Sequence, residues 1–129
     1  MEAGVEKICD LDIDLYRCVS QNIRTREVVI TEERIAHIKE RHPNDYERYA
    51  AYLADMIARP QYILESDMPH TAFILKEYSD YGKRFQLILR LSITGDNPAY
   101  KNSVITFLYI NERKWKKYLR NKKILYKSE

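Results

Sequence analysis

Two of the three histidines in the chain lie in one segment, Ile30–Pro43, among several cationic side chains. Histidine is the side chain that most readily gives or takes a proton near neutral pH. His42 is therefore the first candidate for acid–base chemistry, although an imidazolium there could equally cap a helix C-terminus. His37 lies beside Arg34 and Arg41 at helical spacing. This trio would bind a phosphate or form ordinary cationic surface.

Further along the chain, four residues could contact the same phosphate. Lys76 and Arg90 are bases inside otherwise apolar segments. The ordinary explanation is that each is a charged strand residue whose side chain faces solvent. The alternative is a sheet face whose cations stabilise a pentacoordinate phosphorane. Thr106 could donate to a phosphate oxygen or be only a β-forming residue, and Tyr109 is similarly ambiguous.

Signatures of several other chemistries are missing from the sequence. With three glycines the chain has no Gly-rich phosphate loop, and it has no HExxH motif and no nucleophile elbow. Cys9 and Cys18 do not have zinc-ligand spacing, and the N-terminus has no secretory-signal pattern. We therefore expect reduced thiols in a cytoplasmic protein, and any hydrolytic chemistry to use neither a metal nor a cofactor.

Composition and charge favour one domain with a basic end. The 129 residues are 45% hydrophobic and 32% charged, and no apolar run is long enough to cross a membrane. Eight of the 22 basic residues lie between 111 and 127, where only Glu112 opposes them. This end would contact a polyanion, phosphate first among candidates, or be a solvated basic helix. The 11 tyrosines could bury their rings or line a groove on which bases stack.

The elements that would position these residues follow from periodicity and turn residues. Residues 7–18 alternate between apolar and acidic side chains, which predicts a half-buried strand. Residues 28–30 predict a short strand that leads into a helix capped by Thr31 and ended by a proline. Residues 44–47 resemble a capping box, which predicts a second helix to about residue 58.

The second half of the chain predicts a sheet followed by a helix. Strands are expected at 61–65, 70–78, 83–94 and 101–110, with turns at 79–82 and 95–98, a basic helix from Asn111, and a terminal strand or extended tail at 122–127. This order, an N-terminal strand, two helices, a three- to four-stranded antiparallel meander and a C-terminal basic helix, predicts the α+β class.

The segment Ile30–Pro43 also carries a resemblance to a known family. The pattern R..HI..RHP, a following helix that ends in Arg-Pro, and a downstream meander resemble the phage-associated barnase–EndoU–colicin–RelE-like (BECR) nucleases. The resemblance extends from about Val28 to the C-terminus. We therefore expect an N-terminal strand extension, 1–26, and a BECR-like nuclease domain, 27–129.

The resemblance implies a metal-independent endoribonuclease, a toxin or mobile-element effector that leaves a 2′,3′-cyclic phosphate after attack by a 2′-hydroxyl. The expected catalytic residues are His42, His37, Arg34, Lys76, Arg90 and Thr106, and the expected RNA-binding residues are Arg41, Tyr109, Lys116, Lys117, Arg120 and Lys123. Unlike barnase, the chain shows no glutamate placed to partner the histidine.

The expected partners are RNA, as tRNA, mRNA or ribosome-associated RNA, and an immunity or antitoxin protein. Two other functions are open from the sequence. One is a catalytically silent RNA- or protein-binding module on the same scaffold, and the other is an accessory domain that forms a homodimer through residues 1–26. Convergence of His42, Lys76, Arg90 and Thr106 on one groove would favour the nuclease, whereas their scatter over both sheet faces would weaken that interpretation sharply.

Overall fold

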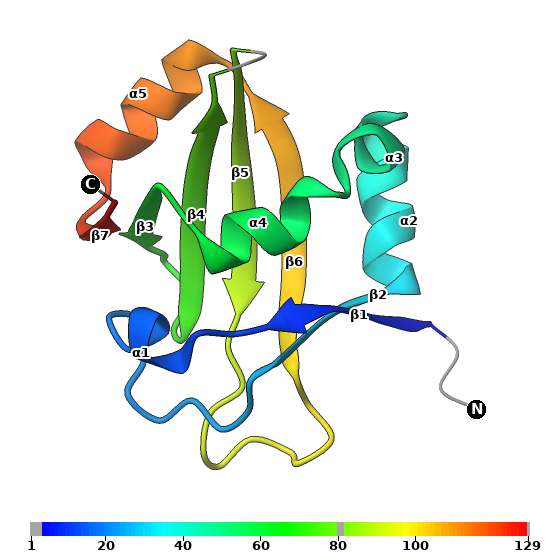
Figure 1. Ribbon diagram of the computed structural model, residues 1–129, viewed down its shortest axis with the longest axis vertical. Coiled ribbons are helices and arrows are strands. Elements are labelled where there is room, and N and C mark those ends of the chain that lie inside the picture. Colours follow the sequence, from blue (N-terminus) through cyan, green and yellow to red (C-terminus); the bar gives the residue numbers. More distant parts are fainter. Residues whose placement is uncertain (1–3, 80–81, 129) are drawn as a thin grey trace.

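A seven-stranded sheet with helices on both faces organises the chain (Figure 1). The computed structural model describes residues 4–79 and 82–128, apart from the side chain of Asp45. The strands are β1 (Val5–Asp10), β2 (Glu27–Thr31), β3 (Tyr62–Glu65), β4 (Thr71–Tyr78), β5 (Lys83–Arg90), β6 (Asn102–Ile110) and β7 (Ile124–Lys127). The helices are α1 (Ile13–Tyr16), α2 (Glu32–Arg41), α3 (Asp45–Tyr49), α4 (Tyr52–Ala58) and α5 (Glu112–Asn121). The predicted α+β class is confirmed.

The sheet is wider than the predicted meander, and it is mixed. Its strand order is β1-β2-β6-β5-β4-β3-β7. The antiparallel meander from β3 to β6 is present as predicted. However, β7 pairs with β3, and β2 pairs with β6 in parallel through Val28–Asn102 and Val29–Ser103. Strand β1 then pairs with β2, so the sheet extends on both sides of the meander.

The two faces of the sheet are covered by different helices, and we name them the α4 face and the α5 face. The main core lies on the α4 face, where Phe85 and Leu87 pack with Ile38 of α2 and Met56 of α4. A second core on the α5 face surrounds Trp115. Helix α5 packs at the β3–β4 side of the sheet, away from α2 and β1 (Figure 1). Helix α5 therefore does not cover the β1–β2 end of the α5 face.

The prediction of one strand over residues 7–18 is wrong in its second half. Strand β1 ends at Asp10, and the carboxylate of Asp12 caps α1 by accepting the amide of Leu15 (3.2 Å). Aspartate is favoured at the N-cap of a helix. The alternating acidic residues, which predicted a strand, therefore include the residue that begins a helical turn. The turn buries Tyr16, whose hydroxyl donates to the carbonyl of Ile57 (2.7 Å).

The second predicted helix is divided into α3 and α4, and its predicted capping box does not form. Asn44 has a left-handed conformation (φ 73°) and makes no side-chain cap hydrogen bond. An N-cap residue normally has an extended backbone, so that its side chain can accept a backbone amide of the first helical turn. The left-handed backbone of Asn44 does not allow this geometry. Glu47 instead forms an ion pair with Lys39 of α2 (3.0 Å).

The predicted starts of two helices are confirmed. The Thr31 hydroxyl accepts the amide of Arg34 (3.1 Å), and Asn111 accepts the amide of Lys114 (2.8 Å). In the turn predicted at 79–82, residues 80 and 81 lie outside the described residues. Among the described helices, none has the length and apolar content needed to span a bilayer.

Candidate functional site

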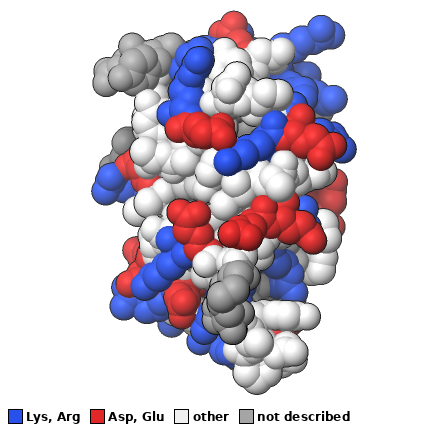
Figure 2. Space-filling view, turned by 90° about the vertical axis from the view of Figure 1, so that its right-hand side faces the viewer, with Lys and Arg blue, Asp and Glu red and all other residues white. Residues whose placement is uncertain are grey.

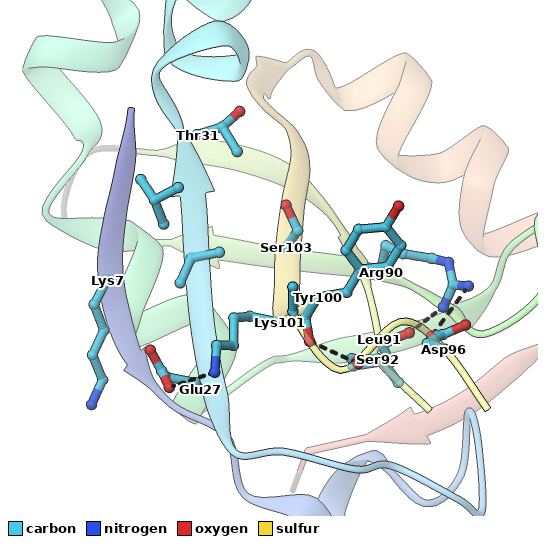
Figure 3. Close-up of a pocket in the computed structure, with 13 residues that line it drawn as sticks. Lys7, Glu27, Thr31, Arg90, Leu91, Ser92, Asp96, Tyr100, Lys101 and Ser103 are labelled. Atoms are coloured by element: carbon cyan, nitrogen blue, oxygen red, sulfur yellow. Dashed lines mark hydrogen bonds and ion pairs between the residues drawn. The ribbon is translucent and has the colours of Figure 1, made fainter. Parts of the chain in front are cut away.

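A groove of about 620 Å³ lies on the α5 face, at the end that α5 leaves open (Figure 3). The apolar part of its lining is Val5, Val29, Leu91 and Ala99. The polar part consists of Lys7, Glu27, Thr31, Arg90, Ser92, Asp96, Tyr100, Lys101 and Ser103. The groove therefore combines cations, carboxylates and hydroxyls over a partly apolar floor.

The strand register explains why these side chains share one face. Val29 pairs with Lys7 on β1 and with Ser103 on β6, and Ser103 pairs with Arg90 on β5. Directly paired residues point to the same side of a sheet, so four strands contribute to one row. Thr31 lies two residues after Val29 on β2 and therefore points to the same side.

The charged side chains in the groove form loose ion pairs. Lys101 lies 3.3 Å from Glu27, and Arg90 lies 3.7 Å from Asp96. The exposed fractions of these four side chains run from 22% to 41%. Pairs this accessible to water contribute about 0–1 kcal/mol, so a cation can exchange its carboxylate for an anionic ligand at low cost. Among the described residues, the Ser103 hydroxyl has no hydrogen-bond partner and is available to a ligand.

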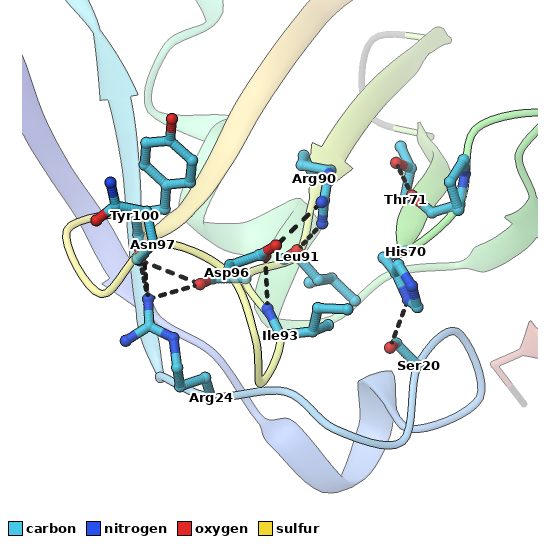
Figure 4. A network of polar contacts seen from close by, with 12 residues as sticks. Ser20, Arg24, His70, Thr71, Arg90, Leu91, Ile93, Asp96, Asn97 and Tyr100 are labelled. Carbon is cyan, nitrogen blue, oxygen red and sulfur yellow. Dashed lines mark hydrogen bonds and ion pairs between the residues drawn. The ribbon is translucent and has the colours of Figure 1, made fainter.

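Arg24 holds the β5–β6 loop, which forms one wall of the groove (Figure 4). Its guanidinium donates to the carbonyls of Asn97 and Tyr100 and to the hydroxyl of Ser92. Asp96 accepts the amide of Ile93 (3.0 Å) within the same loop. These contacts fix the backbone of the loop from both ends.

A fully buried asparagine supports the loop from below. The side chain of Asn102 accepts the amide of Ser92 (2.8 Å) and donates to the carbonyl of Thr25 (2.8 Å). A buried amide with both ends satisfied is a rigid link, here between β6, the loop and the segment before β2. Asn102, Ser103 and Tyr100 were not predicted from the sequence, because only pairing with β2 and β5 brings them to one place.

Helix α2 packs beside β6 and places its cationic stripe away from α3. Ile38 is buried toward the sheet, whereas Lys39 reaches Glu47 of α3. Arg34 and Arg41 lie on the other side of Ile38 at helical spacing, on the flank turned away from α3. Helix α3 lies on the opposite flank of α2 and packs at the α4 face.

Arg34 lies close to the groove along the helix as well. It follows the groove residue Thr31 by three positions, and helical side chains lean toward the N-terminal end of their helix. Strands β2 and β6 run parallel from the Val29–Ser103 pair, and α2 follows β2. Arg34 and Thr106 both lie roughly 10 Å from this pair along the strand direction. Thr106 pairs with Ile88 and shares the α5 face with Arg90. Thr106 and Arg90 therefore share one face of the sheet, and Arg34 lies at a similar height on α2.

Lys76 lies on the opposite face from Arg90 and Thr106. It pairs with Phe85 and points to the α4 face, where its ammonium contacts the carboxylate of Asp55 (2.9 Å) and the carbonyl of Arg59 (2.7 Å). Tyr78 also donates to Asp55. The four residues whose convergence would favour a nuclease are thus divided between two faces.

His42 also lies apart from the groove. It is the C-cap residue of α2, and its amide donates to the carbonyl of Ile38 (2.8 Å). The ten residues of α2 separate it from Thr31, so the two lie eleven positions apart, or roughly 16 Å along the helix axis. Within the described part of the chain its ring has no hydrogen-bond partner. His37 is exposed and lies nearer the groove end of α2.

Three hydrogen bonds together keep the carboxylate of the Lys76 cluster charged. Burial opposes the charge on Asp55, but hydrogen bonds from Tyr78, Lys76 and Arg59 outweigh it and lower the carboxyl pKa below 3.8. Burial and the bond to Asp55 raise the pKa of Tyr78 above its ordinary value of 10.0. Asp55 is therefore a charged acceptor for three donors, an arrangement that suits a structural cluster.

The residues predicted to bind RNA are spread over three places. Tyr109 lies on the α4 face beneath the ammonium of Lys83 (4.8 Å), and Arg41 is exposed on α2. The other four are exposed on or after α5: Lys116, Lys117, Arg120 and Lys123. On the side of the molecule that carries α2, basic and acidic side chains alternate without a continuous basic patch (Figure 2). The predicted RNA-binding residues therefore do not gather at one place, and none of them lines the groove.

Comparison with known proteins identifies a family for the chain. A family model described as phage-Barnase-EndoU-ColicinE5/D-RelE like nuclease2 matches residues 12–127. No curated protein and no solved structure matches the chain. Among the described residues, no three or more His, Cys, Asp or Glu side chains are grouped so that they could hold a metal ion.

Proposed function

Since the chain belongs to the phage-Barnase-EndoU-ColicinE5/D-RelE like nuclease2 family, we propose that it is an endoribonuclease whose active site is the groove on the α5 face. One observation carries this proposal. The strand register gathers Thr31, Ser103 and Arg90 in the groove. We propose that Arg34, three residues after Thr31 at the start of α2, extends this group. Hydroxyl donors and guanidinium groups around one surface are suited to a phosphodiester.

The proposed reaction is transfer of the phosphodiester to the neighbouring 2′-hydroxyl. The 2′-oxygen forms a bond to phosphorus while the bond from phosphorus to the 5′-oxygen breaks, which gives a 2′,3′-cyclic phosphate. His37 accepts the proton of the 2′-hydroxyl and donates a proton to the leaving 5′-oxygen, because it is exposed on the α2 stripe that also carries Arg34. Arg34 and Arg90 stabilise the charge that develops on the phosphoryl oxygens, and Ser103 donates a hydrogen bond to one of them.

The test is cleavage of total RNA by the purified chain in EDTA, with identification of 2′,3′-cyclic ends. We expect cleavage by the unaltered chain and a loss of about 100-fold or more in His37→Ala and in Arg34→Ala. Lys39→Ala is the matched control, because Lys39 lies on the other flank of the same helix and pairs with Glu47. Intact RNA at micromolar protein, or equal activity in all variants, contradicts the proposal.

The charge of α5 supports a second candidate function, an RNA-binding module without catalysis. Within the described residues, Arg113, Lys114, Lys117 and Arg120 have no carboxylate within 4 Å. These side chains are free to bind phosphates along the exposed surface of α5. Binding without cleavage, measured by fluorescence anisotropy, would favour this function. If Lys117 or Arg120 binds one phosphate, its replacement by Ala should lower the logarithmic salt slope by about 0.7.

A further inference from the structure

The groove is larger than the phosphate site that the proposed function requires. Its volume of about 620 Å³ falls in the range of about 300–1,000 Å³ that is typical of small-molecule sites. Thr31 lies toward one end of β2 in the groove, and Glu27 lies four residues away toward the other. The lower end, between Glu27 and the β5–β6 loop, has no part in the proposed reaction.

An exposed aromatic ring stands at this lower end. Tyr100 lines the groove, and 61% of its surface is exposed. Its backbone is nevertheless fixed, because its carbonyl accepts from Arg24 and from the hydroxyl of Ser92 (3.1 Å), and its amide donates to Asn97 (2.9 Å). An exposed ring on a fixed backbone loses little freedom when a ligand stacks on it.

The surroundings of Tyr100 suit a flat, partly polar ligand. Whereas the side chain of Leu91 is fully buried in the main core, Val29 and the exposed Ala99 supply the apolar part of this lining. Polar groups lie around it, including the Lys101–Glu27 pair (3.3 Å) and the carboxylate of Asp96. Figure 3 shows the Tyr100 ring above Arg90, on the loop side of the groove. Nucleobases have an apolar ring face and polar edges, so they match this lining.

We propose that the lower end of the groove binds one nucleobase of the RNA, with the base stacked on Tyr100 and its phosphate directed toward Ser103 and Arg90. This inference rests on the proposed function for its substrate class. It adds that Tyr100 is a binding residue that helps to choose which phosphodiester is cleaved. Lys101, Glu27 and Asp96 contact the edge of the base and contribute to that choice.

Equilibrium binding of small ligands tests the base site without requiring catalysis. Nucleoside 3′-monophosphates and ribose 5-phosphate are titrated into the full chain, and binding is followed by calorimetry and by amide chemical shifts. We expect at least one monophosphate to bind about tenfold more tightly than ribose 5-phosphate. Tyr100→Ala should remove that difference, whereas Tyr100→Phe should keep it, because the phenyl ring still stacks.

Met68→Ala is the matched control, because it truncates an equally exposed side chain (64%) outside the groove. Thermal unfolding checks that each variant is folded, and Tyr100→Leu provides a second non-aromatic variant. Equal binding of monophosphates and ribose 5-phosphate by the unaltered chain overturns the base site. So does unchanged nucleotide binding in both Tyr100→Ala and Tyr100→Leu.

The two proposals can fail separately. If Tyr100 variants lose base binding but the unaltered chain never cleaves RNA, the nuclease proposal fails and the base site stands. If RNA is cleaved but Tyr100→Ala keeps both the cleavage-site preference and the nucleotide affinity, the base site fails and the nuclease stands.

Discussion

Lys76 and Arg90 are both bases inside central strands, yet the structure gives them opposite environments. Lys76 lies on the α4 face, where 19% of its side chain is exposed and Asp55 and the carbonyl of Arg59 bind its ammonium. Arg90 lies on the α5 face, where 36% of its side chain is exposed. Its guanidinium donates to the carbonyl of Leu91, and its pair with Asp96 is longer (3.7 Å) than that of Lys76 with Asp55. A strand charge is thus structural or available to a ligand according to the face it occupies.

The faces differ because they are covered differently. Helix α4 supplies Asp55, which completes the coordination of Lys76 and Tyr78. Over Arg90 the α5 face is open, and the only carboxylate near its guanidinium among the described residues comes from the β5–β6 loop. The proposed site therefore uses Arg90, and Lys76 is expected to act on stability.

The largest effect is expected for Arg90→Gln. We expect kcat/KM for RNA cleavage to fall about 100-fold or more, because the variant has no guanidinium to donate to the phosphoryl oxygens. The free energy of unfolding should change by less than about 1 kcal/mol, because the exposed pair with Asp96 contributes little. Urea denaturation and steady-state kinetics give both numbers. A variant that cleaves normally would remove Arg90 from the site.

Asp55→Ala tests the other face. The substitution leaves Lys76 and Tyr78 without their shared acceptor, and we expect the free energy of unfolding to fall by about 2 kcal/mol after allowance for partial exposure. Cleavage measured below the unfolding transition should be unchanged. A large drop in the activity of the folded protein would mean that the α4 face takes part in the reaction.

A double-mutant cycle of Asp55→Ala and Lys76→Met sharpens the same assignment. Removing both charges avoids an unpaired ammonium, so the double variant should be about 1 kcal/mol more stable than the sum of the single effects predicts. Chemical denaturation of the four proteins measures this coupling. Additive effects would show that the 2.9 Å ion pair contributes nothing to stability.

The smallest effect concerns pH. Because the folded-state pKa of Asp55 is below 3.8, the unfolded chain takes up the proton first as the pH falls. The stabilisation by Asp55 is therefore complete above about pH 4 and is lost as the pH falls further through the folded pKa. Asp55→Ala should lose less of its free energy of unfolding than the unaltered chain between about pH 5 and 2. Parallel acid limbs in the two proteins would contradict this assignment.

Short sequence patterns correctly predicted the helix caps and the strand alternation, because neighbouring residues determine these features. Thr31 and Asn111 cap α2 and α5 as their side-chain chemistry indicates. In β5, Phe85 and Leu87 face the main core and Arg90 faces away from it, as the alternation indicates. Local signals failed at Asp12, where a cap residue imitates strand alternation.

The candidate site was predicted only in part, because its parts come from distant segments. Arg34, His37, Arg90 and Thr106 were identified by type and place, and they stay proposals. Most of the other groove residues carry no signal in the sequence. Thr25 and Asn102, for example, are joined by a hydrogen bond across 77 positions of the chain.

The sequence by itself determined the α+β class, the helix caps, the antiparallel meander and the family resemblance, because short-range periodicity and capping control these features. Only the tertiary structure decided which face each strand charge occupies. Strand β4 is buried on both faces through Leu75, so its sequence has no alternation that could place Lys76. The groove likewise depends on the parallel pairing of β2 with β6, a long-range pairing that brings Thr31 toward Ser103.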